Sequence, residues 1–123
     1  MGVDGHLSLK SSSSSARWFA RDHLRDFHDL QLFIALVNAP DRWWDARTAG
    51  RELQLPDAAA RAALEHLAAR NLLEIRVTGE VRYQFRPGSE ELRLRSLAFA
   101  EAFAADPHEV VRALTSSGSL RST

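Results

Sequence analysis

The chain has 123 residues, of which 45% are apolar and 26% charged, and this length and composition suit one globular domain with a single modest core. No apolar run approaches the ~20 residues of a membrane span, no continuous apolar segment marks a secretory signal near the N-terminus, and no cysteine is present for disulfides or zinc thiolates, so we expect a cytoplasmic protein. Sixteen basic residues balance sixteen acidic ones, which excludes a global basic field and leaves any attraction of nucleic acid to local patches.

Residues 1–15 are rich in Gly and Ser and carry almost no periodic apolar signal, so we expect a disordered segment there. A short helix is predicted from Ala16 onward. A stronger helix follows Asp26, a residue suited to a helix N-cap, and ends before Pro40. The apolar residues that predict these two helices are Trp18, Phe19 and Leu24, then Phe27, Leu30, Phe33, Ile34 and Val37.

Two further helices joined by a tight turn are predicted between Asp45 and Arg70. Asp45 suits the N-cap of the first, Ala46 to Leu53, and the second starts after Pro56, because proline fits the first turn of a helix but not its interior. Gly50 lowers helix propensity by about 1 kcal/mol relative to Ala, which indicates close approach by the second helix. The inward face of that helix is predicted to hold Ala60, Ala63, Leu64 and Leu67. Its outward face is predicted to hold Ala58, Arg61, Ala62, Glu65 and Ala69.

Trp43 and Trp44 precede this helix pair. We expect at least one of the two rings in the core beneath the helices, because a large aromatic side chain gains most from burial. The alternative is an exposed aromatic side chain at a binding surface.

A two-stranded hairpin is predicted after Asn71, a residue suited to a left-handed helix end, because the apolar pattern changes there from helical to alternating. A two-residue turn would place apolar and polar residues on the same face of the sheet. A three-residue loop from Thr78 to Glu80 instead pairs apolar with apolar, and we prefer that register. Its apolar face then holds Leu73, Ile75 and Val77 opposite Phe85, Tyr83 and Val81.

The polar face of this hairpin carries a like-charge pair, because the preferred register sets Arg76 directly opposite Arg82. Arg86 extends the face diagonally. Two interpretations stay open: the arginines contact phosphate, or Glu74 and Glu80 neutralise them on a solvated face.

Two more helices are predicted after the hairpin, the first from Glu90 to Ala105 with Ser89 as its N-cap and the second starting at Pro107. The first has two apolar stripes, more than one small core needs to contact. We therefore expect a homodimer, since a large exposed apolar patch is rare on a monomer. The residues expected at its interface are Trp18, Phe19, Leu92, Leu94, Phe99 and Phe103. The opposing possibility is that the N-terminal helix covers the second stripe within one chain.

Apolar anchors along the chain permit a comparison with a known family. They are Pro40-x-x-Trp43, Asp45-Ala46, Leu55-Pro56, Leu64-x-x-Leu67, Asn71-Leu72-Leu73 and Tyr83-Gln84-Phe85-Arg86-Pro87. This pattern resembles small bacterial winged helix-turn-helix proteins of the transcriptional-regulator type over about residues 26–87. The resemblance implies a three-helix core with a β-wing, frequent dimerisation through flanking helices, and DNA binding by the third helix and the wing.

The expected fold is therefore mainly α with a two-stranded β-wing, a winged helix-turn-helix flanked by N- and C-terminal helices. The predicted organisation is a disordered segment 1–15, a winged helix-turn-helix domain 16–87, helices for dimerisation 88–115 and a flexible tail 116–123.

The leading functional hypothesis is a regulator that binds double-stranded DNA through helix 57–70 and the wing 72–86. Arg61 would read a base, with Ala58 or Ala62 close to a thymine methyl group. The residues expected to contact phosphates are Arg47 and Arg51 on the preceding helix and Arg76, Arg82 and Arg86 on the wing. The alternative is a winged helix that binds only protein, which suits the neutral net charge and the Ala-rich outward face. Local charge clustering in the folded chain would discriminate between the two.

Neither an enzyme nor a metal protein is expected. No paired carboxylates, no nucleophile with a base at a meaningful spacing and no Gly-rich phosphate loop occur, so no cofactor is predicted. His23 and His28 are five residues apart and point to different sides of a helix, unlike a paired ligand site. His66 and His108 are interpreted as helix-surface residues.

Overall fold

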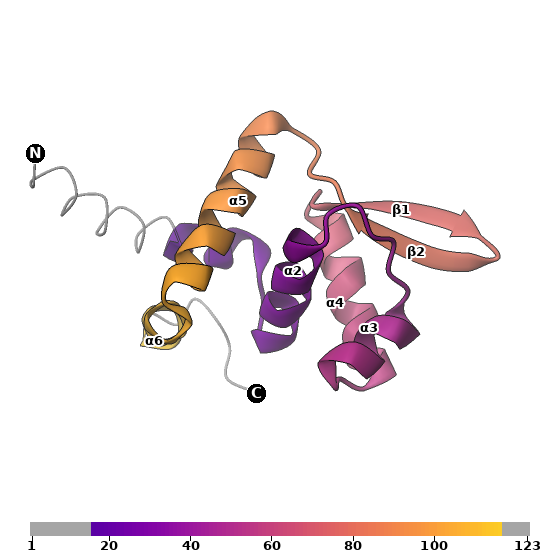
Figure 1. Ribbon diagram of the computed structural model, residues 1–123, viewed down its shortest axis with the longest axis horizontal. Helices are drawn as coiled ribbons and strands as arrows, with labels where there is room; N and C mark the ends of the chain where they lie inside the picture. The colour runs from indigo at the N-terminus through magenta and orange to yellow at the C-terminus, as the bar shows by residue number, and fades with distance from the viewer. Residues whose placement is uncertain (1–15, 117–123) are drawn as a thin grey trace, which may run out of the picture.

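The computed structural model describes residues 16–116 and is mainly helical, with one two-stranded antiparallel sheet (Figure 1). Residues 16–23 are helical. They are followed by α2 (Phe27–Asn38), α3 (Ala46–Leu53), α4 (Asp57–Ala69), β1 (Leu73–Thr78), β2 (Glu80–Phe85), α5 (Glu90–Ala105) and α6 (Pro107–Ser116). The disorder expected for residues 1–15 lies outside the described residues, as does most of the predicted tail. In the range 16–116, none of the helices combines the length and apolarity needed to cross a membrane.

The predicted helix starts are confirmed by side-chain caps. Asp26, Asp45 and Ser89 each accept a hydrogen bond from the backbone N–H three residues later, over 2.7 to 3.1 Å. Asp106 does the same before α6, which extends through Ser116. These caps satisfy donors that the first turn of a helix leaves without a partner.

The turn between α3 and α4 brings the two helices close together at Gly50. A Cβ atom on Gly50 would stand 2.8 Å from the carbonyl oxygen of Leu55 and 3.5 Å from the Cβ of Ala60, which confirms the predicted close approach. Gln54 ends α3 with a φ of 59°, a left-handed conformation that was not predicted from the sequence. Asn71 ends α4 with a φ of 68°, as predicted.

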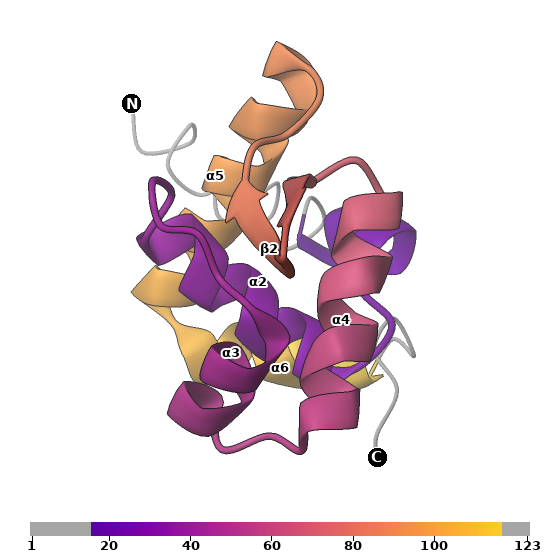
Figure 2. The same ribbon diagram turned by 90° about the vertical axis from the view of Figure 1, so that its right-hand side faces the viewer.

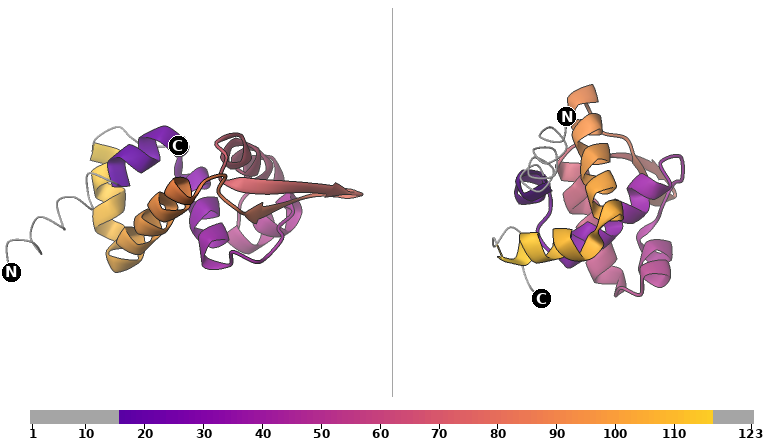
Figure 3. Two further views of the ribbon diagram at one scale, coloured as in Figure 1. Left: turned by 90° about the horizontal axis from the view of Figure 1, so that it is seen from above. Right: turned by 60° about the vertical axis from the view of Figure 1, so that its left-hand side comes forward.

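The hairpin has the predicted register, with Val77 opposite Val81, Ile75 opposite Tyr83 and Leu73 opposite Phe85. Trp44 adds a short bridge to the outer edge of β2, through two backbone hydrogen bonds of 2.7 Å with Tyr83. The hairpin projects beyond the helices, at the opposite end of the molecule from α6 (Figure 3). Its base is therefore buried, whereas its outer half exposes Ile75 (50%), Val77 (69%) and Val81 (45%).

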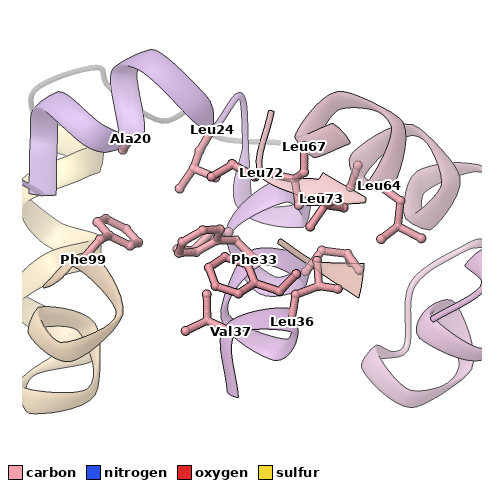
Figure 4. Packing of buried hydrophobic residues seen from close by; sticks show 14 of the residues in the cluster. Ala20, Leu24, Phe33, Leu36, Val37, Leu64, Leu67, Leu72, Leu73 and Phe99 are labelled. Carbon is pink, nitrogen blue, oxygen red and sulfur yellow. The ribbon is translucent and has the colours of Figure 1, made fainter. Parts of the chain in front are cut away.

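The core joins α2, α4, the base of the hairpin and the helical residues 16–23. The predicted inward face of α4 is confirmed, since Ala60, Ala63, Leu64 and Leu67 are all fully buried. An aromatic cluster continues this core toward α5 (Figure 4): the ring of Phe33 lies 5.7 Å from that of Phe99, and Phe19 stacks on Phe99 at 5.0 Å. The segment 16–23 thus packs against α5 within one chain.

Candidate functional site

A cleft of about 610 Å³ lies between the start of α3, the outward face of α4 and strand β2. Figure 2 looks along the hairpin toward this part of the molecule, with α3 below the hairpin and α4 beside it on the right. The cleft is lined by Asp45, Ala46, Arg47, Thr48, Asp57, Arg61, Glu65, Glu80, Val81 and Tyr83. Three segments that are separate in sequence therefore meet around one hollow.

Most carboxylates of this cleft have local partners. Asp45 caps α3, and the hydrogen bond from the Thr48 backbone N–H lowers the pKa of Asp45 below its usual value. Asp57 stands in the first turn of α4, where the helix dipole favours a negative charge. Glu80 forms an ion pair with Arg82 at 3.2 Å. Glu65 has no ion pair within residues 16–116. The pKa of Tyr83 is raised mainly by burial of its hydroxyl group and further by the negative charge of Glu65.

Four of the predicted binding arginines are exposed and form no ion pair in the described part of the chain, and three of these lie on α3 and α4. Arg47 and Arg51 lie one turn apart on α3, and Arg61 lies on α4. Arg47 and Arg61 both line the cleft. Their guanidinium groups are therefore available to an external anion.

The outward face of α4 is as predicted. Ala58, Ala62 and Ala69 are exposed together with Arg61 and Glu65. Small side chains leave the backbone of α4 open to close approach by a partner, on both sides of Arg61.

The hairpin arginines are arranged differently. Arg76 and Arg82 are paired across the strands as predicted. Side chains alternate along a strand, so both point to the face opposite Val81 and Tyr83, and neither lines the cleft. Arg76 stacks over the Trp43 ring at 4.3 Å.

The neutralisation considered for the polar face is confirmed for two of its three arginines. Arg82 pairs with Glu80, and Arg86 pairs with Glu74 at 2.8 Å. All four of these side chains are substantially exposed, and exposed pairs contribute about 0 to 1 kcal/mol, so a stronger anion can displace the carboxylates.

The two tryptophans divide as expected, with one ring in the core. Trp44 is buried, and the guanidinium of Arg42 lies 3.7 Å from its ring centroid. Trp43 is half-buried and carries Arg76. The tryptophan pair thus anchors the hairpin to the body and orients one hairpin arginine.

The predicted dimer interface requires a correction. Phe19 and Phe99 are each only 2% exposed, because they stack on one another inside the chain, so neither can offer its ring to a second copy. For Phe19 and Phe99 the alternative applies: the N-terminal helix covers this part of α5 within one chain. Trp18 and Leu94 are exposed, and Leu92 and Phe103 are half-buried.

A buried polar cluster was not predicted from the sequence. Asp29 is fully buried and accepts hydrogen bonds from Arg25, while Nε2–H of His66 donates to the His23 carbonyl oxygen at 3.0 Å and lies 3.7 Å from Asp29 Oδ2. The interpretation of His66 as a surface residue was wrong, because this ring fills the junction between α4 and residues 23–29. The signal that could have found the cluster was position: Asp29 shares a helix face with the buried Phe33, four residues later.

No three His, Asp or Glu side chains among residues 16–116 gather in a way that could hold a metal ion. Comparison with models of known protein families, with curated proteins and with solved structures finds no significant match for this chain.

Proposed function

We propose that this chain is a winged helix-turn-helix module that binds double-stranded DNA through α4 and the hairpin. The order of elements supports the arrangement: α2, a short bridge at Trp44, the α3–α4 pair and then a hairpin whose second strand receives that bridge. A helix pair of this type presents its second helix to the major groove, and the hairpin takes the place of the wing.

The observation that carries the proposal is the set of three exposed arginines without ion pairs among the described residues, Arg47, Arg51 and Arg61, on two neighbouring helices. Duplex DNA has a phosphate charge for every ~1.7 Å of its axis, so unpaired guanidinium groups on one face gain from releasing its counterions. In this role Arg61 reads a base edge, for which guanine O6 and N7 are the best acceptors. The neighbouring Ala58 and Ala62 leave room for thymine methyl groups.

The test is fluorescence anisotropy with a labelled duplex of randomised sequence, measured at about 50 and 200 mM salt. We expect binding that weakens with salt, and a double variant Arg47→Ala, Arg51→Ala whose log–log slope is shallower by about 0.9 for each phosphate that the removed arginines had neutralised. Arg112→Ala on α6 is the matched control, because Arg112 is an exposed arginine at the far end of the molecule from the hairpin (Figure 1). Undetectable binding at the lower salt, or equal losses in the control, would refute DNA binding.

A second candidate function is a module that binds protein, and the exposed apolar strip Ile75, Val77 and Val81 favours it. These side chains lie on the face of the hairpin that meets the cleft, beside Arg61 and Glu65. An amphipathic partner could cover the strip while its polar residues meet the mixed charges of the cleft.

Selection of a displayed random-peptide library against the chain tests this second candidate. A consensus peptide that binds the wild type, loses affinity in Val77→Asp and keeps it in Leu94→Asp on α5 would support protein binding. Failure of the library to yield a consensus that depends on Val77 would argue against it.

A further inference from the structure

A second hollow shares no lining residue with the cleft. It is a groove of about 540 Å³ between α2, the end of α3 and the C-terminal helices α5 and α6. Its lining is Phe27, Leu30, Gln31, Ile34, Ala35, Asn38, Leu53, Phe103 and Val111. Residues of α3, α5 and α6 thus surround one face of α2.

The lining contains no charged side chain, although charged residues make up 26% of the chain. Its floor is apolar, with Ile34 and Ala35 half-buried at the centre. The polar side chains in it are two exposed amides, Gln31 and Asn38. They are seven residues apart on α2, which places them about 10 Å from each other along one helix face.

We infer that this groove binds a small, uncharged and mainly apolar molecule that carries a hydrogen-bonding group at one end. Its volume lies within the ~300 to 1,000 Å³ of ordinary ligand sites, whose walls are mostly apolar with a few polar groups that fix orientation. A charged ligand would lose its hydration without gaining a partner in this lining. The side-chain amide of Gln31 or of Asn38 can donate a hydrogen bond to a polar group of the ligand or accept one from it.

The size of the groove and the absence of charge in its lining favour a small molecule over a second protein chain. A second protein chain needs about 800 Å² of surface on each partner, far more than a pocket formed by nine side chains. The lining also has no charged side chain that could pair with the polar rim of a macromolecular partner. A small uncharged molecule needs neither the larger area nor such a pair.

The experiment uses N-phenyl-1-naphthylamine, a neutral apolar dye whose fluorescence rises on leaving water. We expect saturable binding by the full chain, at least tenfold weaker in Ala35→Trp, in which the new side chain fills the groove. Ala98→Trp places the same side chain on the exposed face of α5 and should bind as the wild type does. If Ala35→Trp does not fold, Gln31→Trp replaces it in the dye-binding measurement, because Gln31 is an exposed residue of the groove lining.

The anionic analogue 8-anilinonaphthalene-1-sulfonate supplies the charge test. We expect it to bind at least fivefold more weakly than the neutral dye, because no cation lines the groove. Three outcomes would overturn the inference: no saturable binding of the neutral dye, equal binding by the folded groove-filling variants, or preference for the anion. Loss of a two-chain mass in Ala35→Trp by sedimentation equilibrium would identify a second copy as the occupant and also overturn it. None of these readouts depends on DNA, so the outcome is independent of the proposed function.

Discussion

Arg25 encloses the buried carboxylate of Asp29 with three hydrogen bonds. Its backbone N–H donates to Asp29 Oδ2 at 2.8 Å, its Nε–H donates to the same oxygen at 3.0 Å, and its Nη2 donates to Oδ1 at 3.0 Å. Nη2 also donates to the Ala62 carbonyl oxygen at 3.2 Å. One guanidinium therefore satisfies a fully buried charge and ties the start of α2 to the middle of α4.

We predict that Arg25→Ala lowers the free energy of unfolding by about 2 to 3 kcal/mol, because hydrogen bonds to a charged group are lost and a buried carboxylate loses its counter-charge. Urea denaturation measures this change. The matched control is Arg93→Ala, whose ion pair with Glu90 is exposed on both sides, so its loss should cost much less than the loss of Arg25. Equal costs in the two variants would mean that the burial of Asp29 has no energetic consequence.

Leu64 tests the assigned inner face of α4. Leu64→Ala should lower the free energy of unfolding by about 2 to 5 kcal/mol, through lost burial and the cavity left behind. Val77→Ala shortens a side chain on β1 that is 69% exposed, and it should cost far less. An unchanged urea midpoint for Leu64→Ala would contradict the burial of this side chain.

The hairpin arginines test the role of the polar face. If Arg76 and Arg82 contact phosphate, the double variant Arg76→Ala, Arg82→Ala should weaken binding similarly for different duplex sequences and reduce the salt slope. Anisotropy at two salt concentrations measures both effects. Unaltered affinity would mean that stacking on Trp43 and pairing with Glu80 are all that these side chains do.

His23 gives the protein a pH-dependent stability. Burial lowers the pKa of His23 below its usual value of 6.5, against the opposing effect of its hydrogen bond to the Phe19 carbonyl. The unfolded chain therefore binds this proton at a higher pH than the folded chain, so stability falls as the pH drops below about 6.5 and stops falling below the folded-state pKa. In His23→Phe, which keeps a ring stacked on Phe19, this component should disappear.

The measurement is the difference in free energy of unfolding between wild type and His23→Phe at a series of pH values from 7 downward. Taking the difference removes the pH-dependent contributions of groups that both proteins contain. A difference that does not change with pH would contradict the assignment.

A homodimer stays a prediction, and it now depends on the exposed Trp18 and Leu94 and the half-buried Leu92, because Phe103 lines the groove assigned to a small molecule. We expect sedimentation equilibrium to give a two-chain mass that Leu94→Asp reduces to one chain. Ala58→Asp, which adds the same charge at an exposed position on α4, serves as a control for added charge. A mass of one chain at every wild-type concentration would exclude the dimer.

Local patterns in the sequence determined the elements and their boundaries. The caps at Asp26, Asp45 and Ser89 were identifiable because a cap joins residues three apart. The hairpin register was identifiable for a similar reason: side chains alternate along a strand, so one loop length pairs Val77 with Val81 and another does not.

Only the tertiary structure decided which element covers which face. Periodicity marked Phe19 and Phe99 as apolar but could not show that they stack on each other rather than on a second chain. For the same reason, the sequence did not predict the contact between Asp29 and His66, which are 37 residues apart. A helical pattern specifies the direction of a side chain relative to its own axis, whereas burial and charge pairing depend on the neighbouring element, and that neighbour is set by the packing of the whole chain.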